Sequence, residues 1–175
     1  MPDLSMLPES ELAREAFNNP VLFGQQHQQR IADLIDIANL SLRHFKEATP
    51  QLEKALCLHT HHARYWAVIA CTTFGQQAIE FAPLIRKLAA EDQHGLVRVR
   101  AAEYLGLTGT GDPVPTLMDA LQKSTSDIEV GLMLNTVALL RDSPQHYRFN
   151  IPASRFTKPI LKNDTVQRRL EYLAP

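Results

Sequence analysis

The sequence has few cysteines and no long apolar run. Only Cys57 and Cys71 occur among 175 residues, and two thiols do not make the disulfide framework that holds small secreted domains together. No apolar stretch approaches the roughly 20 residues that cross a bilayer, and the start, MPDLSMLPESELARE, has neither a basic leader nor an apolar signal region. We therefore expect a soluble chain without an export signal, whose thiols stay unpaired.

The sequence also lacks an excess of charge of either sign. Eighteen Lys and Arg residues oppose 19 Asp and Glu residues, which gives a formal net charge of -1. No overall field therefore draws the chain to nucleic acid or to an anionic membrane surface, and we expect neither as a partner. The hydrophobic content of 45% is ordinary for a folded domain.

Alternating apolar and polar runs with hairpin turns are absent, and helical periodicity takes their place. Apolar residues recur every three or four positions in the ranges 29–45, 62–74, 78–91, 96–107, 114–124 and 127–142. The sequence therefore predicts an all-α fold. We expect Trp66 and Tyr104 to fill the core between these helices.

The helical segments repeat. Aligning HHARYWAVIACTTFG with HGLVRVRAAEYLGLTG places Arg64 on Arg98, an offset of 34 residues. In a third copy, IEVGLMLNTVALLRD, Gly131 stands where the arginine was, 33 residues after Arg98. The intervening segments PQLEKAL, PLIRKLA and PTLMDAL share the same period. Two helices in a period of this length are typical of an α-solenoid, in which each hairpin packs only against its neighbours.

This period predicts an α–α superhelix of the HEAT or armadillo kind, with about three to four hairpins and a capping helix at each end. We assign residues 1–25 to the N-terminal cap, 26–142 to the repeats and 143–175 to an irregular tail with a C-terminal capping helix. The N-terminal cap is expected to bury four apolar residues. They are Phe17, Val21, Leu22 and Phe23. The C-terminal capping helix is expected to begin near Asp164.

The stretch GLVRVRAAEYLGLTG resembles the V-R-x-x-A-A-x-A-L-G-x-x-G pattern of HEAT-like repeats. In that pattern the arginine lies early in the inner helix and bonds to an acid or a carbonyl of the preceding loop. The resemblance implies that Arg64 and Arg98 are structural, since a buried guanidinium needs such partners.

The order of the pieces is similar to the helical extension at the C-terminal end of many bacterial type I sulfatases, especially those like heparan N-sulfatase. ARYWA at 63–67, VRVRAAEYLG at 97–106 and NTVAL at 135–139 carry this resemblance, which covers about residues 26–142. Histidines replace the usual acids in the loop at 59–62, and the third repeat lacks its arginine.

The sulfatase resemblance implies a non-catalytic accessory or scaffold domain that packs on a catalytic domain or on a separate protein partner. The C/S-x-P-S-R motif that supplies formylglycine is missing, so the chain alone is expected not to be an enzyme. No cofactor is expected here, since calcium would belong to the catalytic domain of a parent sulfatase. Such sulfatases are usually exported, and contact with a sulfated glycan would follow from their substrates.

Two short motifs suggest sites. His59, His61 and His62 lie within four residues, but no Cys-x-x-Cys or His-Glu-x-x-His completes a metal set. We favour a solvated loop, with Tyr65 beside it as a possible surface contact. The glycine-rich GLTGTGDPVP at 106–115 lacks the lysine of a phosphate loop and is better explained as a helix cap and turn, with Asp112 capping the next helix.

Two interpretations remain open for the tail and for the function. The tail carries cations among aromatic residues, which fits either a polyanion contact or a wrap over the last repeat. Its cations are Arg148, Arg155, Lys158, Lys162, Arg168 and Arg169. The alternative to a scaffold is an enzyme on a HEAT-like framework, such as an alkylpurine DNA glycosylase or a bilin lyase. No catalytic residue is assigned, because no nucleophile motif is present.

Overall fold

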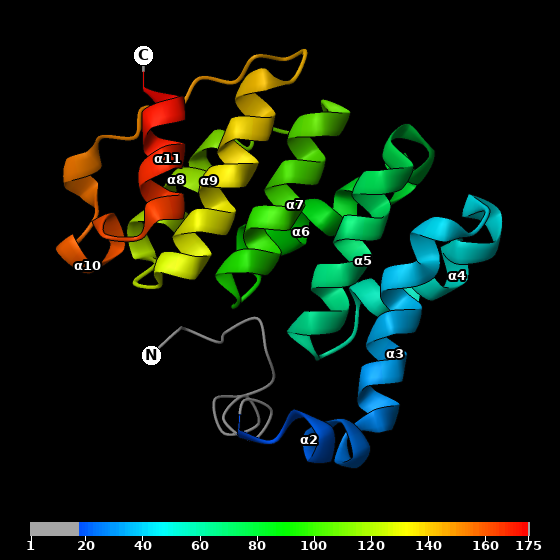
Figure 1. Cartoon of the computed structure of the whole chain (residues 1–175). Coiled ribbons are helices and arrows are strands. Elements are labelled where there is room, and N and C mark those ends of the chain that lie inside the picture. The colour runs from blue at the N-terminus through cyan, green and yellow to red at the C-terminus, as the bar shows by residue number, and fades with distance from the viewer. Residues whose placement is uncertain (1–17, 175) are drawn as a thin grey trace.

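The computed structural model describes residues 18–174, and every regular element in that range is a helix (Figure 1). This confirms the all-α class predicted from the periodicity. None of the described helices has both the length and the apolar character needed to cross a membrane.

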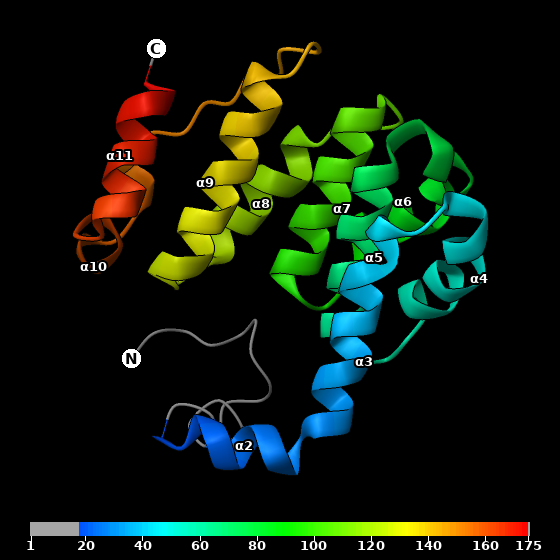
Figure 2. The ribbon, with the colours of Figure 1, turned by 45° about the vertical axis from the view of Figure 1, so that its right-hand side comes forward.

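The helices stand in two rows. In the front row each helix packs against the next (Figure 1). This row contains α3 (Gln28–Ala38), α5 (His61–Phe74), α7 (Gly95–Thr108), α9 (Asp127–Asp142) and α11 (Asp164–Leu173). The back row contains α4 (Phe45–Leu56), α6 (Ala82–Glu91) and α8 (Val114–Lys123). The chain alternates between the rows, so the hairpins α4–α5, α6–α7 and α8–α9 stack side by side (Figure 2). The solenoid-like architecture is therefore confirmed.

The two rows differ in how their helices are covered. Helix α7 is buried on several sides, because α5, α6, α8 and α9 all pack against it. Helix α8 is amphipathic and buries only one side, through Leu117, Ala120 and Leu121. A two-layer stack of hairpins requires this difference. Its back-row helices bury one side, and its front-row helices are covered on several sides.

Tyr104 was predicted to be core, and its side chain is fully buried. Its hydroxyl donates to the carbonyl of Ala78 at 2.8 Å, and burial raises its pKa to about 12. The same prediction is wrong for Trp66, which is 38% exposed. Trp66 lies at the border of the apolar stripe of α5, where so large a ring extends beyond the neighbouring helix.

Short 3₁₀ helices and glycine turns join the rows. The helices η1 (Asn39–Leu42) and η2 (Gly75–Phe81) lie between rows, and a third, η3 (Ala153–Arg155), follows α9. Helix α7 ends as predicted in a glycine cap, because Gly109 has a left-handed backbone with φ of 70° and Thr110 N–H donates to the Leu105 carbonyl at 2.9 Å. The Asp112 carboxylate then accepts from Val114 N–H, which begins α8.

The N-terminal end differs from the prediction. Helix α2 (Pro20–Gln26) is the first described element, and it projects from the two rows (Figure 2). Val21 is 71% exposed and Leu22 is 47% exposed, so the expected inward packing is wrong for both. Phe17 and the helix expected at 7–17 lie outside the described residues. Among the described helices α2 contacts chiefly α3, which leaves its apolar side chains uncovered.

The C-terminal end is closed. After α9 a strap without regular secondary structure, residues 144–157 apart from η3, leads to α10 (Lys158–Leu161) and then to α11. Helix α11 begins at Asp164, as predicted, with Asn163 accepting from two backbone amides as its N-cap. Val166 is fully buried against the second half of the core, whereas Gln167 and Glu171 face solvent.

The packing of α11 explains why the third repeat lacks its arginine. Gly131 is buried, and a Cβ atom at this position would meet the Thr165 methyl group at 3.7 Å. A helix that covers the end of the stack thus occupies the space that Arg64 and Arg98 fill in the earlier units. A methyl group at this position would make only an ordinary contact with α11, whereas a side chain as long as arginine would crowd it.

Replacing Gly131 therefore tests the cap. Gly131→Arg is expected to lower the free energy of unfolding by about 2 kcal/mol, because the long side chain must displace α11. Gly131→Ala is expected to raise it by about 0.5–1 kcal/mol, since the added methyl group meets only an ordinary contact and alanine favours a helix. Urea unfolding followed by circular dichroism measures both. Destabilisation of equal size by the two substitutions would contradict this account of the cap.

Candidate functional site

Arg64 joins the loop between α4 and α5 to the loop between α6 and α7, in the next hairpin. Its guanidinium binds both carboxylate oxygens of Asp92, with Nε to Oδ2 at 2.6 Å and Nη2 to Oδ1 at 3.0 Å. Its Nη1 donates to the carbonyls of Leu58 and His59, each at 2.7 Å. The side chains of Arg64 and Asp92 are 14% and 2% exposed. The carbonyls belong to the preceding loop, as the repeat pattern implied, but the acid belongs to the following one.

Arg98 makes a weaker version of the same connection. Its Nε donates to the Ala89 carbonyl at 3.2 Å, and its Nη2 lies 2.9 Å from Asp119 on α8. Asp119 also binds Lys123, and hydrogen bonds from Lys123 and Arg98 lower its pKa. Both arginines therefore reach forward to an acid of the next unit, but the second pair is more open to solvent.

The histidines do not form a solvated loop. His59 is exposed in the loop before α5, but His62 is buried in its first turn. His61 stacks between two imidazoles, with ring centroids 3.8 Å from His62 and 3.6 Å from His94. Tyr65 is only 6% exposed. The expected surface contact is therefore wrong for His62 and Tyr65, because both lie on a buried side of α5.

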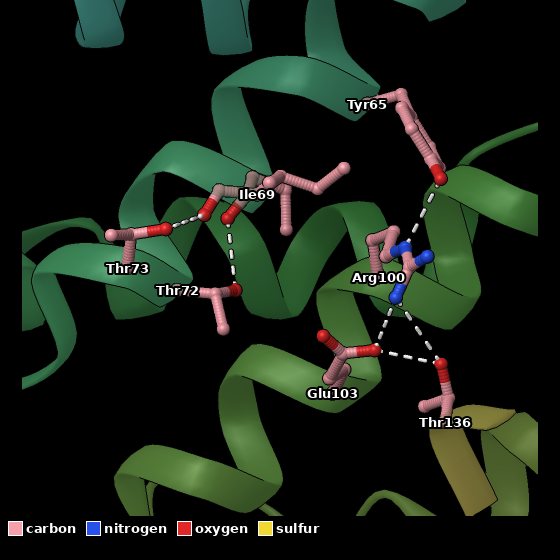
Figure 3. A network of polar contacts seen from close by, with 8 residues as sticks. Tyr65, Ile69, Thr72, Thr73, Arg100, Glu103 and Thr136 are labelled. Carbon is pink, nitrogen blue, oxygen red and sulfur yellow. Dashed lines mark hydrogen bonds and ion pairs between the residues drawn. The ribbon is translucent and has the colours of Figure 1, made fainter. Parts of the chain in front are cut away.

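Tyr65 belongs to a polar network that connects α5, α7 and α9 (Figure 3). Arg100 donates from Nε to the Tyr65 hydroxyl at 3.2 Å, and from Nη1 to Glu103 at 2.6 Å and Thr136 at 3.4 Å. The Thr136 hydroxyl donates to the same Glu103 oxygen at 2.7 Å. Burial of the guanidinium opposes its charge, but Glu103 and Tyr65 outweigh this effect and raise the pKa of Arg100.

The network is closed on itself. Glu103 is 8% exposed and Thr136 is 1% exposed, so the carboxylate is held inside the stack by the residues that bind it. The hydroxyls of Thr72 and Thr73, also drawn in Figure 3, bond to carbonyls of their own helix and take no part. A charge paired and buried in this way stabilises the helix arrangement and is poorly placed for acid–base chemistry. Sequence spacing did not single out this cluster, because its members lie on three different repeats.

A groove of about 650 Å³ runs beside the loops that Arg64 joins. Apolar and polar residues contribute to its lining, which is made by the end of α4, by α6 and by the loops that follow them. The lining includes Cys57, Leu58, His59, Leu84 and Lys87. Asp92 also lines it, but Arg64 neutralises that carboxylate. Cys57 and His59 both line the groove, but no hydrogen bond between described residues joins the two side chains.

In the described part of the chain, neither the cysteines nor the metal-binding residue types indicate a reactive site. Cys57 is exposed and Cys71 is buried, and neither forms a disulfide. Burial raises the pKa of the Cys71 thiol to about 12, which keeps it protonated and unreactive. Within residues 18–174, no three side chains of His, Cys, Asp or Glu converge as metal ligands.

Several exposed apolar side chains lie in the first helices of the described chain. The three most exposed large apolar residues of the described chain are Leu42 at 82%, Val21 at 71% and Ile35 at 52%. All three lie in α2, α3 or the adjoining η1, and Leu22 is also exposed. Ile35 and Leu42 are about two helical turns apart and therefore fall on one side of this segment. We call Val21, Leu22, Ile35 and Leu42 the open end.

Comparisons with protein-family models, with curated proteins and with solved structures find no match for this chain.

Proposed function

We propose that this chain is a non-catalytic protein-interaction module that docks on a folded partner through its open end. The observation that carries the proposal is the exposure of Leu42, Val21 and Ile35, which exceeds that of every other large apolar side chain in the described range. Water contact with such side chains is unfavourable by about 25 cal/mol per Å². A neighbouring surface that covers them recovers this free energy.

The difference between the two ends supports the proposal. At the far end, α11 turns Gln167, Arg168 and Glu171 to solvent and buries Val166. Solenoid ends need a polar cover of this kind to remain monomeric and soluble. The first end has no such polar cover among the described residues. Exposed apolar residues typically mark an interaction surface where they lie together.

The charges beside the open end indicate the chemistry of the partner. Asp33 and Asp36 are exposed on α3 next to Ile35, and Arg30 is half-buried. Arg43, which directly follows Leu42, is exposed as well. The expected partner is therefore a folded domain with an apolar patch and charges of both signs at its rim, since complementary rim charges guide association. The proposal assigns the chain no catalytic step.

The sulfatase resemblance suggests a narrower version. On that basis alone, the partner would be a sulfatase catalytic domain, in the same polypeptide or in a separate one, and the open end would be its contact surface. A partner that carries C/S-x-P-S-R would support this version. An enzyme on this framework, as in the glycosylase or lyase alternative, is favoured by no cluster in the described residues.

Site-specific photocrosslinking in cells that produce the protein tests the open end. A benzoylphenylalanine placed at Leu42 is expected to capture one folded protein reproducibly, because position 42 would lie inside the interface. The matched control places the same group at Tyr172, which is 51% exposed on the closed end. The crosslinked chains are then identified by mass spectrometry.

The double variant Ile35→Asp/Leu42→Asp provides the specificity control, with the crosslinker moved to Val21. Both positions are exposed, so the fold is expected to keep its helicity while the crosslink falls at least about tenfold through the loss of apolar contact. Equal capture from positions 42 and 172, or capture that survives the double variant, would rule out docking through this end.

A further inference from the structure

Residues 147–151 of the strap lie on the stack as an extended chain. Tyr147, Phe149 and Ile151 are half-buried and pack against the second half of the core, whereas Arg148 and Asn150 are exposed. Alternation at every second residue is the pattern of a β-strand with one face on an apolar surface. The Tyr147 hydroxyl also donates to the Gly106 carbonyl at 3.3 Å, which anchors the beginning of the segment.

The backbone of this segment is unpaired. Between residues 147 and 151, no backbone amide or carbonyl bonds to any described part of the protein. The neighbouring backbone bonds, from His146 to Ser143 and from Arg155 to Pro152, close turns on either side. An extended segment with unpaired amides and carbonyls is a template for another strand.

The strap and the α10 segment that follows it are also basic. From Ser143 to Asn163 the sequence contains Arg148, Arg155, Lys158 and Lys162 but no Asp or Glu, and all four cations are exposed. Two carboxylates from other segments lie near the start of the strap. Asp112 raises the pKa of Tyr147, after the larger effect of burial, and Asp142 is bound by Tyr172 and Arg141. The cations farther along this range have no ion pair with a described residue.

We propose that residues 147–151 bind an extended, acidic segment of another protein, which adds to the strap as a β-strand. Backbone hydrogen bonds would supply most of the affinity, as in other complexes formed by strand addition. Alternate apolar side chains of the incoming segment would lie beside Phe149 and Ile151, and its acids would lie beside Arg148. This site is separate from the open end and does not depend on it.

A defined peptide tests the site. The probe is an acetylated and amidated hexapeptide of alternating valine and glutamate, titrated into the ¹⁵N-labelled full chain. We expect amide shifts centred on residues 147–151, with alternate amides gaining protection from hydrogen exchange because neighbouring residues point to opposite edges. Arg148→Glu is expected to weaken binding about tenfold. The matched control Arg168→Glu reverses a cation on α11 that is also exposed, and it is expected to leave binding unchanged.

Two further peptides decide the mode of binding. The same sequence with every backbone amide N-methylated keeps its charge but loses its donors, and it is expected not to bind. A valine–lysine peptide is expected to bind at least tenfold more weakly, because its charge is reversed. Equal binding of the methylated peptide, an effect of Arg168→Glu as large as that of Arg148→Glu, or no amide shift at millimolar peptide would overturn the proposal.

Discussion

Replacing Arg64 with methionine is expected to lower the free energy of unfolding by about 3 kcal/mol, since breaking a buried ion pair leaves the other charge without a counter-charge and Asp92 keeps only the His94 N–H as a donor among the described residues. Asp92 is only 2% exposed and takes two hydrogen bonds from this guanidinium. Methionine keeps most of the apolar stem but cannot bind the carboxylate. It also removes the hydrogen bonds to the carbonyls of Leu58 and His59. Urea unfolding followed by circular dichroism measures the loss.

The equivalent residue of the next repeat provides the control. Arg98→Met is expected to cost about 1 kcal/mol or less, because the pair is partly solvated. Asp119 is 34% exposed and keeps Lys123 as a second cation. If the two substitutions destabilise the protein equally, then burial of the acid is not what distinguishes the two repeats.

Replacing Arg100 with methionine is expected to lower the free energy of unfolding by about 3 kcal/mol, at the lower end of the range for a broken buried pair. The guanidinium retains some contact with water, because its side chain is 20% exposed. Glu103 would remain inside the stack with the Thr136 hydroxyl as its remaining hydrogen-bond donor within the network. The substitution also removes the bond to Tyr65 that connects α7 with α5.

A double variant separates the charge from the packing. Arg100→Met/Glu103→Met removes both charges and leaves apolar side chains of similar length, so it is expected to recover at least half of the lost stability. The coupling follows from a thermodynamic cycle of the wild type, the two single variants and the double variant, all measured by urea unfolding. Strictly additive losses would show that the ion pair itself is not the source of the effect.

The architecture could be predicted from the sequence because its cause is periodic. Apolar residues at helical spacing predict the helices, and the recurrence of the same segments after about 33 residues predicts a stack of hairpins. The end of α7 at Gly109 and the start of α11 at Asp164 were also predictable, since both depend on local capping residues.

The predictions are wrong at residues whose burial depends on tertiary packing. Trp66 is exposed although it lies among apolar residues, and His62 and Tyr65 are buried although they follow a polar loop. Helical spacing gives the direction of a side chain around its own axis, but it does not give the distance of the neighbouring helix. Val21 was expected to be inside for the same reason, and no described helix lies over it.

The polar contacts also divide into residues that the sequence predicts and residues that it does not. The two repeat arginines could be found by alignment, because each copy carries its own. Their acids could not, since Asp92 and Asp119 occupy different places in their repeats, one in a loop and one within α8. The strap was predicted to be irregular, but its unpaired backbone depends on the absence of a neighbouring strand. Composition alone carries no signal for that property.

The contacts between arginines and acids run in one direction along the stack. Arg64 and Arg98 each bind an acid of the following unit. A copied hairpin inserted before α8 would therefore bring an acid for the arginine of the preceding unit and an arginine for the acid of the following unit. Beyond α9 this exchange stops, because Gly131 has no side chain to offer and α11 covers the position. A hairpin inserted between existing units would therefore keep these contacts, whereas one added after α9 would have to replace the packing of α11 on Gly131.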